Sequence, residues 1–234
     1  MKKKFYKALV VVIFMTSATY LSGQSVSKET RKASGFSEIG FGVAGTLTVK
    51  VGSDFSVVLE GDKEYLSEIE TVVRDNKLYI RNYNNHFFNN EKVDVYITIP
   101  ELRGIGVSGS GTAKTEGKVK ADKIYFNVSG SGRIVVSDLE ADQFESGISG
   151  SGNVIVNGTG SADKGTIHVS GSGSYRGESF EIDHLEVNIS GSGSCSCKAG
   201  DELNARVSGS GNVNYYGNPR IDARVSGSGH VRSR

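Results

Sequence analysis

Short runs of alternating apolar and polar residues cover most of the chain and predict an all-β protein. In the second half, apolar residues at every second position lead into a recurring motif, as at Ile124, Phe126 and Val128. The residues between them, such as Tyr125 and Asn127, are polar. Such alternation is typical of strands with one buried and one solvated face. The pattern therefore predicts short strands whose apolar side chains share one core.

The recurring motif is Ser-Gly-Ser-Gly, and it occurs seven times at intervals of 18 to 21 residues. The copies begin at Ser108, Ser129, Ser149, Ser170, Ser190, Ser208 and Ser226. A β-branched residue precedes each copy, and apolar alternation resumes after it, as at Ile134 and Val136. Flexible linkers lack apolar residues at fixed distances from a repeated motif. A period of about 20 residues predicts the coils of a single-stranded parallel β-helix, or β-solenoid, for which right-handed winding is expected.

The motif itself has two possible roles in a coil. If the strand runs straight through it, Gly109 and Gly111 face inward, and Ser108 and Ser110 form hydroxyl ladders on a flat outer surface. If the glycines adopt positive φ, the motif is a tight corner whose serines bond to neighbouring coils. The corner is favoured, because glycine inside a strand is costly and usually marks a bend.

A change in composition divides the chain. Of its 31 glycines, 24 lie from Gly104 onward. The preceding segment, 36–103, has alternating strands without the motif, and Pro100 ends the last of them. We expect this segment to be an N-terminal β region that caps the solenoid, because stacked coils need a terminal cover. The repeat solenoid is expected over residues 104–234.

The N-terminus indicates export. Lysines at positions 2, 3, 4 and 7 precede a short apolar run from Ala8 to Met15, which is the layout of a signal peptide over residues 1–23. Residues 24–35 are expected to be a flexible start of the mature chain. Because Gln24 stands where a lipoprotein carries cysteine, no lipid anchor is expected. No other segment is apolar enough to span a membrane, so the protein is expected in the periplasm or at the cell surface.

Two stretches carry a family resemblance. They are Val93-Asp94-Val95-Tyr96-Ile97-Thr98-Ile99-Pro100-Glu101-Leu102 and the segment from Ile105 to Gly111, followed by the later motif copies. With these features the chain resembles the family described as "putative auto-transporter adhesin, head GIN domain", found in exported proteins of Bacteroidetes, over roughly residues 36–231. The resemblance implies a β-helical, adhesin-like envelope protein and supplies no binding residues.

Composition and rare residues exclude several kinds of chemistry. The 27 basic and 26 acidic residues include four leader lysines, so the mature chain is slightly acidic and nucleic acid is not an expected partner. Cys195 and Cys197, the only cysteines, align with inward positions and are expected to be small buried hydrophobes. The histidines lack metal-ligand spacing; they are His86, His168, His184 and His230. We expect no metal and no cofactor.

No catalytic residues are expected, although β-helices include polysaccharide-active enzymes. The candidate carboxylates are better interpreted as turn residues that lead into strands; they are Asp122, Asp142, Asp183, Asp201 and Asp222. The leading hypothesis is a non-enzymatic adhesin-like protein that binds a glycan or another cell-surface or matrix ligand. The alternative is a periplasmic structural or interaction scaffold, and a polysaccharide-active enzyme is a more remote alternative.

The Asn-rich segment 82–90, which contains three aromatic residues, is a candidate for stacking on sugar rings. The sequence assigns neither binding residues nor an oligomeric state.

Overall fold

The computed structural model describes residues 26–83 and 91–234. The expected signal peptide, 1–23, lies outside the described residues, as do residues 84–90 of the Asn-rich segment.

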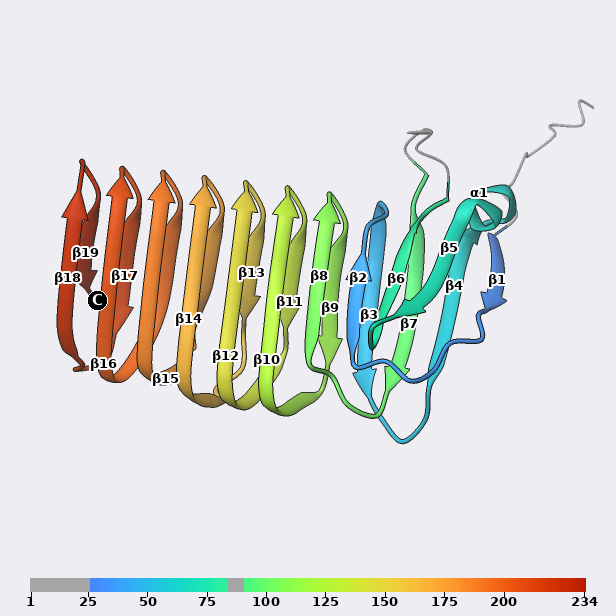
Figure 1. Cartoon of the computed structure of the whole chain (residues 1–234), viewed down its shortest axis with the longest axis horizontal. Helices are drawn as coiled ribbons and strands as arrows, with labels where there is room; N and C mark the ends of the chain where they lie inside the picture. Colours follow the sequence, from blue (N-terminus) through green and yellow to red (C-terminus); the bar gives the residue numbers. More distant parts are fainter. Residues whose placement is uncertain (1–25, 84–90) are drawn as a thin grey trace, which may run out of the picture.

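The chain winds into a β-solenoid with two long parallel sheets (Figure 1). One sheet contains the strands that end in the motif serines, and we call it the serine sheet. Its order is β6 (Lys77–Asn82), β2 (Glu38–Phe41), β8 (Gly104–Gly109), β10 (Lys118–Gly130), β12 (Asp138–Gly150), β14 (Ser161–Gly171), β15 (Ser174–Gly191), β16 (Ser194–Gly209) and β18 (Arg220–Ser226). All of these pairings are parallel, which confirms the solenoid prediction.

The opposite sheet combines the strands that follow each motif with two strands from before the first motif. It contains β7 (Val93–Ile99), β3 (Gly45–Val51), β9 (Thr112–Glu116), β11 (Arg133–Val136), β13 (Asn153–Val156), the first residues of β15 and β16, β17 (Asn212–Tyr216) and β19 (His230–Ser233). In Figure 1 the nearer strands run upward and the farther strands downward while the coils advance to the left. This is right-handed winding, as the crossover rule predicts.

The predicted apolar positions fill the space between the sheets. Ile124, Phe126 and Val128 on β10 are at most 2% exposed, as the alternation predicts. Identical positions of successive coils pair in register, so each inward side chain packs on its equivalents above and below. Phe144, whose register neighbour Gly165 has no side chain, packs edge to face on Phe180 with ring centroids 5.3 Å apart. Packing between neighbouring coils is a main source of solenoid stability.

The motif is a corner, and its two glycines have different roles. The first glycine adopts positive φ, +97° at Gly109 and +113° at Gly130, which favours glycine because it has no Cβ. The second glycine faces the core: a Cβ on Gly132 would lie 2.6 Å from Cγ1 of Val107. The backbone ladder continues through the corner, since the Ser131 amide donates to the Gly109 carbonyl at 2.9 Å.

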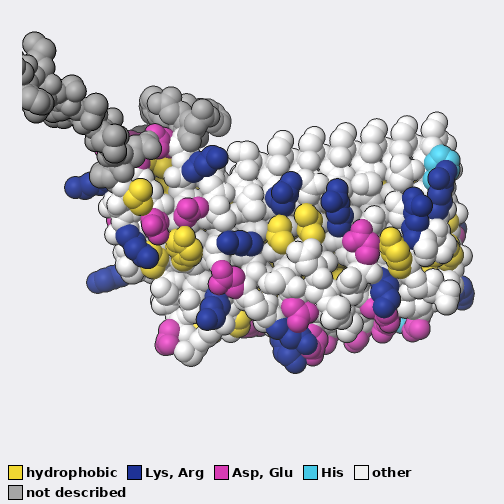
Figure 2. Space-filling view, turned by 180° about the vertical axis from the view of Figure 1, so that it is seen from behind, with side chains coloured by type: hydrophobic (Ala, Val, Ile, Leu, Met, Phe, Trp, Pro, Cys, Tyr) yellow, Lys and Arg dark blue, Asp and Glu magenta, His cyan; other side chains and the backbone are white. Residues whose placement is uncertain are grey.

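The first serine of the motif nevertheless faces outward. Ser108 and its equivalents are exposed and stack in register along the sheet. Features of both predicted arrangements therefore occur together: a corner at the first glycine and a ladder of hydroxyls just before it. Viewed from behind, the motif turns form one edge of the solenoid as a regular row of protrusions. Over most of its length this edge carries no charged or hydrophobic side chains (Figure 2).

Antiparallel strands flank the first coils. β4 (Ser56–Asp62) pairs with β7 and with β1 (Val26–Thr30), and β5 (Ile69–Arg74) pairs with β6. Between β4 and β5 lies the short helix α1 (Lys63–Glu68), whose first turn is capped by the Asp62 carboxylate. A capping role for this region stays a prediction.

The N-terminal region differs from expectation in one respect. β1 lies within residues 24–35, for which we expect a flexible start of the mature chain, yet its five residues pair with β4 along their whole length. Backbone hydrogen bonding orders this segment despite its mostly polar side chains. Across residues 26–83 and 91–234, no helix combines the length and apolar character needed to cross a membrane.

Candidate functional site

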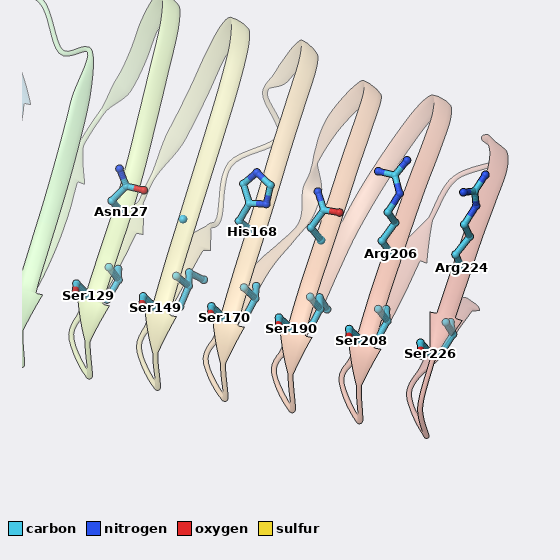
Figure 3. A pocket seen from close by; sticks show the side chains of 18 residues that line it. Asn127, Ser129, Ser149, His168, Ser170, Ser190, Arg206, Ser208, Arg224 and Ser226 are labelled. Carbon is cyan, nitrogen blue, oxygen red and sulfur yellow. The ribbon is translucent and has the colours of Figure 1, made fainter.

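A shallow groove of about 820 Å³ crosses six coils of the serine sheet (Figure 3). One wall, the serine row, consists of Ser129, Ser149, Ser170, Ser190, Ser208 and Ser226. The other wall, the mixed row, consists of Asn127, Gly147, His168, Asn188, Arg206 and Arg224. The backbone of the β-branched residues between these rows forms the floor. We call this feature the serine groove.

Strand geometry fixes the dimensions of the serine groove. Residues two apart on a strand face the same side and are about 6.6 Å apart, which sets the distance between the walls. Six coils at about 4.8 Å per strand give a length of about 24 Å along the solenoid axis. His168, Val169 and Ser170 are consecutive residues of one strand. Because the Val169 side chain is buried in the core, the side chains on either side of it face outward, so the packing of the coil positions both walls of the groove. The groove is therefore long, narrow and repetitive.

The mixed row changes character along the groove. Gly147 has no side chain, and the amide oxygen of Asn127 occupies the space that a Cβ there would need. Toward the C-terminal end the row carries two guanidinium groups, those of Arg206 and Arg224. Figure 3 shows Asn127, His168, Arg206 and Arg224 of the mixed row in a line across the strands, beside the line of labelled serines. One end of the groove is thus uncharged and the other is basic.

A carboxylate beside the groove orients part of the mixed row. Glu186 accepts hydrogen bonds from Asn188 at 2.9 Å and from Arg206 at 3.0 Å. Arg224 lies 3.6 Å from Asp222 on its own strand. The guanidinium groups of Arg206 and Arg224 remain largely exposed, so each retains donors for a ligand.

A smaller groove of about 270 Å³ continues the same surface toward the N-terminal strands. Its walls include Lys77 and Tyr79 of β6, and glycines leave the β2 and β8 positions open. The Lys77 ammonium lies 5.6 Å from the ring centroid of Tyr79 and 5.7 Å from that of Tyr125. Burial, with a hydrogen bond to Glu38, raises the pKa of Tyr125 well above its usual value. Tyr79 therefore supplies the aromatic ring of this smaller groove, and the Lys77 ammonium also lies near Tyr125, which lines a neighbouring pocket.

The candidate carboxylates do not gather in one place. Asp122 and Asp142 lie within β10 and β12, at positions omitted from the strand register between paired neighbours. Asp222 lies in the middle of β18, in register with Asn204, and so is a strand residue and not the turn residue expected. A separate pocket of about 400 Å³ brings together Glu38, Glu101, Asp122 and Glu145 with Arg103, Lys123 and Tyr125. The Arg103 side chain donates to Glu101 at 2.6 Å, and Tyr125 donates to Glu38. Two of the four carboxylates are thus hydrogen-bonded to a neighbouring side chain.

The cysteines occupy core positions, as predicted. Cys195 and Cys197 are fully buried and align with Tyr175 and Gly177 of the preceding coil. Burial raises the pKa of the Cys195 thiol well above its usual value, which disfavours the reactive thiolate. Of the histidines, His168, His184 and His230 are exposed, and His86 lies outside the described residues. Within 26–83 and 91–234, no cluster of three or more His, Cys, Asp or Glu side chains could hold a metal ion.

Sequence reasoning did not identify the mixed row as the wall of a groove. Its residues stand two positions before each motif serine, where the pattern predicts only a polar outward residue. The alternation of apolar and polar residues predicted that these positions face outward. The groove itself depends on coil stacking and on the absence of a side chain at Gly147.

The fold and the groove define a class: a right-handed β-solenoid with a long groove along one sheet. A sequence profile of the family described as "Putative auto-transporter adhesin, head GIN domain" matches residues 35–219. The chain belongs to this family, which confirms the resemblance seen in its motifs.

Solved structures share the fold. A "putative adhesin" from Bacteroides fragilis NCTC 9343 superposes with a TM-score of 0.83 at 22% identity, over 91% of this chain and 98% of that one. A "putative lipid binding protein" from Parabacteroides distasonis ATCC 8503 has a TM-score of 0.72 at 22% identity, covering 89% and 96%. A "putative adhesin" from the same organism has a TM-score of 0.72 at 24% identity, covering 89% and 97%. No curated protein matches the chain.

Proposed function

We propose that this protein is an exported, non-enzymatic, adhesin-like protein of the cell envelope that binds a linear glycan in the serine groove. The observation that carries the proposal is the uninterrupted run of six hydroxyls beside the mixed row across six coils. Serine hydroxyls both donate and accept hydrogen bonds, so they match the hydroxyls of a sugar chain in either orientation. The repetitive spacing suits a repetitive ligand.

The two ends of the surface support the same ligand class. The tyrosine rings near Lys77 can stack on sugar faces, and the exposed guanidinium groups of Arg206 and Arg224 can bind an acidic substituent. The groove is open along its length, which allows a polymer to extend beyond it. A linear glycan with acidic groups uses all of these features.

Family membership supports the adhesin-like role, and the signal-peptide pattern supports export. The periplasmic scaffold is the competing function. It requires no ligand in the groove, so a direct binding measurement separates the two.

The test is a binding screen of the purified protein on a panel of neutral and acidic glycans, with a groove variant and a matched control. Ser170→Tyr places a ring in the middle of the serine groove. Ser196→Tyr makes the same change on the outward face of the opposite sheet. We expect Ser170→Tyr to weaken binding by about tenfold or more, equivalent to about 1.4 kcal/mol per tenfold, and Ser196→Tyr to leave it unchanged.

Two results would overturn the proposal. Equal loss in both variants would show that the ligand does not use the groove. No binding to any glycan by a correctly folded protein would leave the scaffold as the better account.

A further inference from the structure

The mixed row continues beyond Asn127 toward the N-terminal strands. In register, Asn127 is followed by Gly106 of β8, Gly40 of β2 and Tyr79 of β6. The space between Asn127 and Tyr79 is the smaller groove of about 270 Å³, which we call the Lys77 recess. Asn127 and Ser129 line both the recess and the serine groove, so the two form one continuous outward surface.

An aromatic ring and two hydroxyls border the Lys77 recess. The Tyr79 ring leans over Gly40, because a Cβ on that glycine would lie 3.3 Å from Cδ1 of Tyr79. On the side of the serine row, Ser108 and Ser129 are register neighbours and contribute their hydroxyls. Apolar surface with a few placed polar groups is the usual composition of a small-ligand site.

The Lys77 ammonium lies at the floor of the recess. Its side chain reaches from β6 past β2 to β8, where a Cβ on Gly106 would lie 3.9 Å from Nζ. The ring centroids of Tyr79 and Tyr125 are 5.6 Å and 5.7 Å from the same Nζ. Attraction between the ammonium and the two aromatic rings favours this position of the charge.

The positive charge of Lys77 has no carboxylate partner within the part of the chain that the structure describes. Its register neighbour Glu38 accepts a hydrogen bond from Tyr125 and lines the neighbouring pocket. Arg81 also borders the recess, but it forms an ion pair with Glu70 at 2.8 Å. The ammonium of Lys77 therefore keeps N–H donors for an anionic ligand.

We propose that the Lys77 recess is a subsite that binds one acidic sugar residue, with its anionic group on the Lys77 ammonium and its ring against Tyr79. This subsite presupposes the proposed glycan-binding function and specifies the chemistry of the ligand at one end of the serine groove. Lys77 is half-buried, so a hydrogen bond from its ammonium to an anion is stronger than one to a neutral hydroxyl. The rest of the glycan continues past Asn127 along the serine row.

The test compares two ligands that differ in charge: oligogalacturonates and the same oligomers as neutral methyl esters. Affinities are measured by titration calorimetry for the wild type, Lys77→Gln and the control Lys114→Gln. Lys114 is an exposed lysine on β9 in the opposite sheet, so its substitution removes the same charge away from the recess. We expect Lys77→Gln to weaken binding of the acidic oligomers by about tenfold and to leave the esters unchanged. Lys114→Gln is expected to match the wild type with both ligands.

Three outcomes contradict the subsite: a wild type that does not prefer the acidic oligomers, a preference that survives in Lys77→Gln, or an equal loss in Lys114→Gln. Ser170→Tyr tests the serine groove separately. If Ser170→Tyr weakens binding of both ligands while Lys77→Gln changes neither, the groove stands and the subsite is wrong. If Lys77→Gln removes the preference while Ser170→Tyr has no effect, the subsite stands and the glycan does not follow the groove.

Discussion

The inner glycine ladder gives a sharp test of coil packing, and Gly132→Ala is the simplest perturbation. An added Cβ would lie 2.6 Å from Cγ1 of Val107 and 2.8 Å from the carbonyl oxygen of Gly111. That carbonyl is held in place because it accepts a hydrogen bond from the Arg133 amide at 3.0 Å. Overpacking of this kind costs about 1–3 kcal/mol. In a chain of this size, each kcal/mol lowers Tm by about 2–4 °C.

The matched control is Gly106→Ala on the outward face of β8. A Cβ there would lie 3.9 Å from the Ile39 carbonyl oxygen and 3.9 Å from Nζ of Lys77, and the φ of Gly106 is not in the left-handed region. Alanine at such a site is expected to leave stability unchanged or to raise it by about 0.4–1 kcal/mol. Thermal unfolding followed by far-ultraviolet circular dichroism compares the two variants. Equal Tm values for Gly132→Ala and Gly106→Ala would refute the packing argument.

Three further predictions concern strain, reactivity and pH. Gly109→Ala adds no close contact but forces alanine to φ near +97°, so we expect a loss of about 1–3 kcal/mol in the same unfolding assay; a wild-type Tm would contradict this. The buried cysteines are expected to react with Ellman's reagent only after denaturation, because burial raises the pKa of Cys195; rapid reaction of the native protein would contradict their core placement. Lys118, 2.5 Å from Glu140, lowers the pKa of that carboxyl below its usual 4.5, so this ion pair stabilises the fold above that pH and its contribution is lost as pH falls through the lowered pKa. Glu140→Gln is therefore expected to lower Tm slightly at neutral pH and not in strong acid, and an equal loss at both would be evidence against the pair.

The repeat made most of the solenoid predictable from sequence. The near-regular spacing of the motif predicted the coil, and the period-two alternation predicted the inward side chains, including the buried Cys195 and Cys197. Both inferences depend on local pattern alone. They succeed because every coil repeats the same environment, so one interpretation applies to all of them.

Features that depend on pairing between distant segments were not predictable. β2 pairs in parallel with β6 and β8, so the serine sheet runs across position 104 without interruption. The strands before that position lack the motif, and no local signal shows that they continue the same sheet. The ordering of β1 likewise depends on β4, about thirty residues away.

The candidate site was only partly predictable for a related reason. Outward serines followed from one of the two arrangements considered for the motif, and the corner followed from the other. The structure combines them, because positive φ at the first glycine turns the chain only after the serine has completed its strand. The groove appears when the polar residue two positions earlier is added as a second wall.

An adhesin-like protein must present its binding surface outside the cell. The most direct measurement is antibody labelling of the protein on intact cells of the producing bacterium, compared with cells whose outer membrane has been opened, with a known periplasmic protein as the control. We expect labelling of intact cells while the periplasmic control stays unlabelled. Labelling only after the outer membrane is opened would contradict the adhesin-like role and favour the periplasmic scaffold.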